Sequence, residues 1–215
     1  METKKPLFYL LAGLMGGCVP VLSLHPLYTK ENVIFKQELL GTWADPNSPG
    51  TTWQFKRADK DKNIYKLVFS DEDGRKGLFD THLVELKGRL FLDLYPADFP
   101  CDLEDPNKVD WPYNSFFLVP VHTFIKVDSI EPTLKMRLTI DDKVEQLLKE
   151  NPKAVKHTVL EDKSLLTAST KELQAFVLKY ADDERLFGES TVLKRTKAKD
   201  PQEPGDKQSG DSAGE

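Results

Sequence analysis

The sequence contains few of the residues that hold small exported domains together or bind metals. Its 215 residues include only two cysteines, Cys18 and Cys101, and four histidines. No Cys-x-x-Cys pair and no Cys/His spacing typical of a zinc site occurs. We therefore expect no metal or other cofactor, and a fold that is stabilised by packing instead of disulfides.

Motifs of nucleophilic or phosphate chemistry are also missing, because the chain has no Gly-x-Ser-x-Gly segment and no glycine-rich phosphate loop. Cys101 is followed by acidic residues, which oppose formation of a thiolate. Asp80 and His82 share one face of a predicted strand, which suits acid–base chemistry but is equally common on a solvated face. We expect no enzymatic activity, and an exported hydrolase remains the least favoured alternative.

An apolar run at residues 6–15 is too short to cross a bilayer, which takes about 20 apolar residues as helix. The run follows Lys4 and Lys5 and leads into Gly16 and Gly17. This order of charged, apolar and small residues is typical of a secretory signal peptide. We therefore expect residues 1–17 to be removed.

The segment Leu14-Met15-Gly16-Gly17-Cys18 resembles the lipobox of bacterial lipoproteins, in which the cysteine is acylated and becomes the first residue. The resemblance implies that Cys18 carries palmitate-like chains that anchor the protein in a membrane of the cell envelope. Val19 stands where an Asp marks retention in the inner membrane, which favours the outer membrane. The alternatives are an ordinary signal peptide or a buried N-terminal helix in which Cys18 has no role.

The formal net charge is −5, and charges of both signs are interspersed along the chain. A mildly acidic, mixed surface argues against nucleic acid as a partner. Residues 196–215 contain no aromatic and no branched aliphatic side chain, so they form a disordered tail by prediction. Between these ends we expect a lipidated N-terminus and linker over 18–37, where Pro20 and Pro26 disfavour helix, and one α+β domain over 38–195.

Apolar and polar residues alternate from about residue 52 to residue 140, with polar turns every ten to fourteen residues. This pattern predicts a curved antiparallel sheet or a partial β-barrel built from hairpins. In the last third, Asp141 or Asp142 is placed to cap a helix that ends before Asn151, and Ser169 with Glu172 fits a capping box that begins a second helix. A pair of short strands at 157–160 and 164–167 separates the two helices, and 190–195 is a candidate closing strand.

The segment Gly41-Thr42-Trp43 resembles the Gly-x-Trp signature of the lipocalins, whose Trp closes the base of an antiparallel barrel that holds an apolar ligand. The chain departs from that family in having two C-terminal helices and no disulfide pair. The resemblance implies a cavity lined by the candidate ligand-binding residues Trp43, Trp53, Phe55, Tyr65, Leu67 and Phe69. The alternative is that Trp43 only plugs one end of a filled core.

These observations favour a membrane-anchored bacterial lipoprotein with a non-enzymatic binding or envelope-accessory role, holding a small apolar ligand in a lipocalin-like sheet. The alternative is a structural lipoprotein with a filled core that binds an envelope protein. In that case the proline-rich segment 96–120 is the candidate contact surface, because loops of this length in compact domains are usually functional or mobile.

Overall fold

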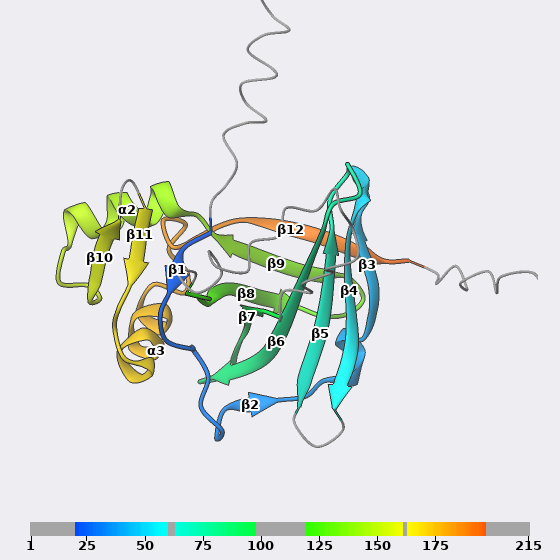
Figure 1. The fold of residues 1–215 in the computed structure, drawn as a ribbon, viewed down its shortest axis with the longest axis horizontal. Helices are drawn as coiled ribbons and strands as arrows, with labels where there is room; N and C mark the ends of the chain where they lie inside the picture. The colour runs from blue at the N-terminus through cyan, green and yellow to red at the C-terminus, as the bar shows by residue number, and fades with distance from the viewer. Residues whose placement is uncertain (1–19, 60–62, 98–118, 161–162, 197–215) are drawn as a thin grey trace, which may run out of the picture.

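Backbone pairing closes the chain into a ring of strands, as seen in the computed structural model of the protein (Figure 1). The structure describes residues 20–59, 63–97, 119–160 and 163–196. The predicted signal peptide, Cys18, Cys101, residues 98–118 of the proline-rich segment and the tail from residue 197 lie outside the described residues.

Eight antiparallel strands form a closed barrel, in which each strand pairs with the next along the chain and the last returns to the first. The last strand, β12, lies between β9 and β3, so the barrel has no open edge. The α+β, lipocalin-like fold expected from the sequence is confirmed, with a closed ring. The barrel strands are β3 (Gly41–Asp45), β4 (Ser48–Asp59), β5 (Ile64–Ser70), β6 (Lys76–Leu86), β7 (Arg89–Pro96), β8 (Thr123–Ser129), β9 (Leu134–Thr139) and β12 (Phe187–Arg195).

Turn chemistry fixes the register of the longest hairpin. Leu86 of β6 pairs with Arg89 of β7, which leaves a two-residue connection. Lys87 and Gly88 have φ angles of 49° and 77°. Positive φ at both positions is what the favoured two-residue hairpin turns of right-twisted strands require, and glycine adopts it without strain.

The residues of the Gly-x-Trp segment close one end of the barrel, called the base here. The indole of Trp43 is fully buried, and its Nε1 donates to the Leu39 carbonyl at 2.9 Å. The Arg195 guanidinium lies 4.3 Å above the Trp43 ring and donates to the Glu38 carbonyl at 2.6 Å. Gly41 has a φ of 118°, a backbone conformation that favours glycine, and a Cβ there would also displace Arg195 Nη1, which would lie 2.7 Å away.

The segment before β3 seals the same end. It contains a short strand, β2 (Val33–Ile34), which pairs with β6, and a 3₁₀ turn over Gln37–Leu39. The Tyr65 hydroxyl accepts from the Lys36 N–H at 2.7 Å and donates to the Lys36 carbonyl at 2.9 Å. Phe35 stacks on the Tyr65 ring, with 4.7 Å between centroids. Burial raises the pKa of Tyr65 to about 12, so the phenol stays neutral and donates this hydrogen bond.

Between β9 and β12 the chain leaves the barrel and builds a second layer on its outer face, at one side of the molecule (Figure 1). The two strands of this layer pair with each other, and β1 (Leu22–Ser23) adds a parallel third strand. Among the described residues, no helix combines the length and the apolarity needed to cross a bilayer. The elements of this layer are α2 (Asp141–Glu150), β10 (His157–Leu160), β11 (Lys163–Leu166) and α3 (Thr170–Lys179).

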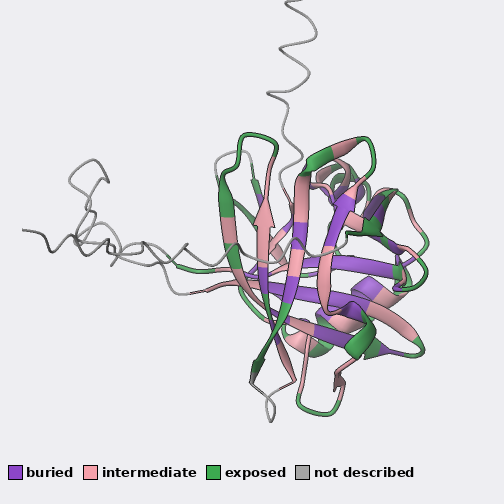
Figure 2. Cartoon of the chain, turned by 90° about the vertical axis from the view of Figure 1, so that its right-hand side faces the viewer, coloured by how far each residue is buried: buried purple, intermediate pink, exposed green. Residues whose placement is uncertain are grey.

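Two apolar cores result, and the barrel wall separates them. The first lies inside the barrel; the second lies between the outer face of the wall and the helices. Strand β7 contributes side chains to both cores, since Phe91 points outward to the second core while Leu92 and Leu94 point inward. Buried residues accordingly run along the strands, while the turns are exposed (Figure 2).

Two local expectations at the helices had different outcomes. The Ser169–Glu172 capping box is confirmed, because Glu172 Oε2 accepts from the Ser169 N–H at 2.9 Å. The expected cap of α2 by Asp141 or Asp142 is wrong: Ile140 holds the N-cap position without a side-chain bond. Asp141 instead turns toward β11 and accepts from the Ser164 N–H at 3.3 Å.

Candidate functional site

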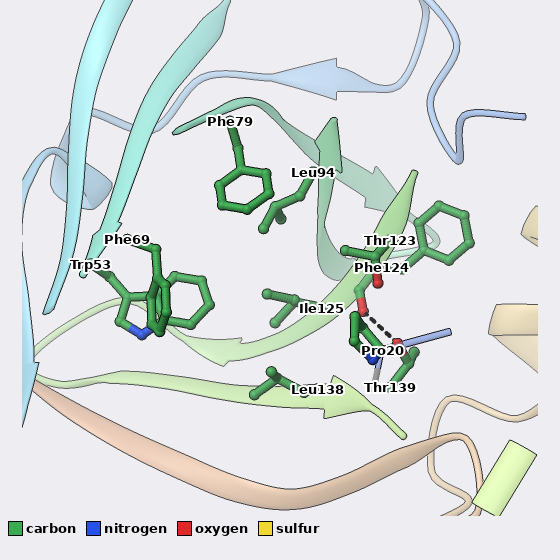
Figure 3. A pocket seen from close by; sticks show the side chains of 10 residues that line it. All are labelled: Pro20, Trp53, Phe69, Phe79, Leu94, Thr123, Phe124, Ile125, Leu138 and Thr139. Atoms are coloured by element: carbon green, nitrogen blue, oxygen red, sulfur yellow. Dashed lines mark hydrogen bonds between the residues drawn. The ribbon is translucent and has the colours of Figure 1, made fainter. Parts of the chain in front are cut away.

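An apolar cavity of about 190 Å³ lies inside the barrel, at the end opposite the base (Figure 3). It is lined by side chains from the ends of β5, β7 and β9 and from the beginnings of β6 and β8, together with one tryptophan of β4. The apolar side chains of this wall are Trp53, Phe69, Phe79, Leu94, Ile125 and Leu138.

The wall is buried at depth and partly exposed at its outer end. Leu94 and Ile125 are 4% and 3% exposed. Phe69, Phe79 and Leu138 are only half-buried. The wall is therefore exposed at the barrel end and made of buried apolar side chains toward the middle.

The six candidate ligand-binding residues all lie in the barrel interior, but they divide between two halves. Trp53 and Phe69 line the cavity. Trp43, Phe55, Tyr65 and Leu67 are buried at the base, where they pack against one another and against the segment before β3. None of these four side chains lines the cavity, and the alternative interpretation of Trp43 stays a prediction.

Sequence reasoning did not single out the remaining wall residues Phe79, Leu94, Ile125 and Leu138. Their signal was present in the alternation of the strands, since odd positions of β6 and β8 and even positions of β7 and β9 face inward. What the alternation could not give is the register between strands, which decides how far along the barrel each inward side chain lies.

The polar groups of the wall do not present hydrogen-bonding atoms to the cavity. Thr139 Oγ1 donates to the Phe124 carbonyl and accepts from the Val21 N–H, each at 3.3 Å. Thr123 Oγ1 is buried and has no partner among the described residues. The atoms that face the cavity are carbon, and no charged side chain of the described residues lines it.

The described chain begins at this cavity. Pro20 lines it, and the next residue, Val21, is fully buried and bonded to Thr139. Leu27 is also fully buried. Residues 20–37, which the sequence suggested as a linker, therefore pack against the barrel and its outer layer.

A second group of polar, titratable side chains lies on the outer face of β6–β8. Asp93 is fully buried there; its Oδ1 lies 2.7 Å from His122 Nδ1, and its Oδ2 accepts from the Leu27 N–H at 2.6 Å. His82, the cross-strand neighbour of Asp93, stacks under the Tyr28 ring, with 3.8 Å between centroids. A carboxylate and two imidazoles thus converge, although the sequence placed them in separate strands.

The Asp93–His122 pair holds the N-terminal segment against the outer face of the barrel. Both carboxylate oxygens are occupied, His122 is only 8% exposed, and the bond to Leu27 ties the segment to the barrel. No group of three or more His, Cys, Asp or Glu side chains placed to hold a metal occurs in the described part of the chain. A buried carboxylate bonded in this way is costly to remove, because its partners are left unpaired.

A polar cavity of about 230 Å³ outside the barrel is lined by ions that neutralise one another. Lys126 Nζ lies 3.2 Å from Asp182 Oδ1, and Arg137 Nε lies 2.7 Å from Asp128 Oδ2. Hydrogen bonds from Arg89 and Lys126 lower the pKa of Asp182 to about 2. The first pair joins the end of the outer layer to β8 and the second joins β9 to β8, and the lining side chains leave no net charge to attract a ligand.

Comparison with known proteins found no family model, no curated protein and no solved structure that matches this chain. The geometry alone defines the class of protein: a closed, lipocalin-like barrel with a buried base and an apolar cavity at the other end.

The cluster around His82 makes stability depend on pH in a defined direction. Burial, the largest effect, lowers the pKa of His82, although Asp93 and Asp80 nearby oppose this shift. The unfolded chain, with a histidine pKa of about 6.5, therefore takes up this proton first as the pH falls. The contribution of His82 to the free energy of unfolding is complete above a pH of about 6.5, the pKa in the unfolded chain. It is lost as the pH falls through the pKa in the folded protein.

We predict that His82→Gln loses less stability than the wild type between neutral pH and about pH 5, measured by urea unfolding at a series of pH values. His25→Gln is the matched control, because His25 is exposed and should leave the pH dependence unchanged. An identical pH dependence in His82→Gln and the wild type would contradict the burial of a neutral His82.

Proposed function

We propose that the protein is a membrane-anchored bacterial lipoprotein that binds a small apolar ligand in its barrel, without catalysis. The observation that carries this proposal is the apolar cavity in a barrel whose other half is buried. A second cavity of about 200 Å³ lies near the base, but Lys36, Glu38 and Glu131 line it together with Leu90 and Ile130. Of the two, the cavity at the other end is the one whose exposed wall is apolar throughout.

Keeping this space lowers the stability of the protein. Cavities left by core truncations cost about 24 cal/mol per Å³, so a fully enclosed cavity of this size would cost on the order of 4–5 kcal/mol. This cavity is open at one end, which makes that figure an upper bound. That is a large share of the roughly 5–15 kcal/mol by which domains are stable. A ligand that fills the cavity recovers part of this cost, which is the physical reason to assign it a binding role.

The volume limits the size of the ligand. Apolar cavities of about 150 Å³ bind benzene, and sites for drug-sized molecules take about 300–1,000 Å³. The cavity here, at about 190 Å³, fits a single ring or a short hydrocarbon segment.

The proposed anchor lies next to the cavity. Cys18 precedes Pro20 by two residues, so their Cα atoms are at most about 8 Å apart, at 3.8 Å per residue. Acyl chains on Cys18 would contribute about 0.8 kcal/mol per buried CH₂, and two or more give durable anchoring. The accessible end of the barrel would then lie at the membrane surface, in the outer membrane where the organism has one.

The binding role is tested by filling the cavity. We predict that Leu138→Trp abolishes binding of toluene, measured by calorimetry, because the indole occupies the ligand volume. Leu90→Trp is the matched control: Leu90 is also a half-buried leucine that packs on the barrel core, but it lies near the base and does not line this cavity. Absence of toluene binding in the wild type, or equal binding in both variants, would refute the assignment.

The anchor is tested by metabolic labelling in a bacterium. We predict that the full chain incorporates labelled palmitate and that Cys18→Ala abolishes the label, since the acylated thiol is gone. Cys101→Ala should retain the label, which separates the proposed site from the other cysteine. Label that survives Cys18→Ala would end the lipoprotein proposal and leave the barrel's binding role untouched.

A further inference from the structure

We infer that the cavity accepts the end of a single aliphatic chain, which enters tail first and leaves the polar head group of its amphiphile outside. This inference rests on the proposed binding role and names the chemistry of its ligand. It follows from the surface of the cavity, from its gradient of exposure and from its position beside Pro20.

The cavity offers no partner to a polar group. Its exposed atoms are carbon, and no charged side chain of the described residues lines it. The hydroxyl of Thr139 is already bonded, and that of Thr123, which has no partner among the described residues, is buried in the wall and not exposed to the cavity. A hydroxyl or amide buried there would lose its bonds to water without replacement, and an ionised carboxylate would lose far more. Only hydrocarbon can enter without such a loss.

The gradient of exposure gives the direction of entry. Pro20, Phe69 and Phe79 are half-buried at the accessible end, while Leu94 and Ile125 are almost fully buried at depth. A chain therefore inserts with its terminal methyl innermost. Its head group stays at the barrel end, where water solvates it. The affinity therefore depends on the aliphatic chain and not on the chemistry of the head group.

Aliphatic chains have two possible sources at this position. One is a free amphiphile or bilayer lipid, and the other is an acyl chain on Cys18, within about 8 Å of Pro20 along the backbone. Both present the same chemistry to the cavity, and a comparison of acylated and non-acylated protein distinguishes them.

The test is a series of 1-alkanols and matching alkanoates, titrated near neutral pH into the full chain carrying Cys18→Ser. Affinity should rise about fourfold for each added methylene and then reach a plateau when the cavity is full. Alkanol and alkanoate of equal chain length should agree within about threefold, because the head groups remain in water. Fluorescence of Trp53, which lines the cavity, and calorimetry provide two independent readouts.

Leu138→Trp should shorten the chain length at which the plateau is reached, while Leu90→Trp should leave it unchanged. Binding of alkanols by the Cys18→Ser protein but not by acylated protein would identify the protein's own acyl chain as the occupant; binding by both would identify a free amphiphile.

Three results would overturn the inference. These are affinity that does not depend on chain length, affinity that rises without a plateau, and alkanoates that bind much more weakly than alkanols. If toluene binds and no alkyl compound does, the binding role stands and the aliphatic ligand is wrong. If neither binds, the proposed function itself fails.

Discussion

The structure depends on the return of β12 to the barrel. This strand pairs with β9 on one side and with β3 on the other, so without it both neighbours would present unpaired N–H and C=O groups along an open edge. The chain reaches β12 only after it has built the outer layer of two helices and two short strands. Closure of the barrel and folding of the outer layer are therefore coupled, and β7, buried on both faces, joins the two cores physically.

Closure also creates the difference between the two ends. At the base, β12 brings Arg195 over Trp43, and the segment before β3 adds the Tyr65–Lys36 bonds. At the other end the wall carries side chains that leave a cavity between them, close to the point where the chain approaches the barrel at Pro20. A buried base beneath an accessible apolar cavity is an arrangement suited to holding a hydrocarbon ligand.

Local rules predicted much of the fold, because they depend on neighbouring residues. Alternation located the strands, and Ser169 with Glu172 located the start of α3. Asp141 failed as a cap because a tertiary partner, the Ser164 N–H, competes for its carboxylate. The contact between Asp93 and His122 was out of reach for the same reason: it depends on the pairing of β7 with β8, which no local pattern encodes.

The candidate site was predictable in part. Trp53 and Phe69 were identified from the inward face of two hairpin strands, and both line the cavity. Phe55 and Tyr65 carry the same pattern yet lie in the half at the base, because position along the barrel depends on register and on the segment that seals the base. The signal segment and the acylation of Cys18 stay predictions from the sequence, since these residues lie outside the described ones.

The central claim is that one half of the barrel interior is packed and the other half holds a dry, apolar cavity. A crystal of the protein under xenon pressure tests it directly, because xenon binds apolar cavities of this size and ignores filled or polar ones. The account predicts one xenon site inside the barrel, in contact with Trp53, Leu94 and Ile125, and none in contact with Phe55 or Tyr65. Side chains that fill the first position, or xenon bound at the base instead, would contradict it.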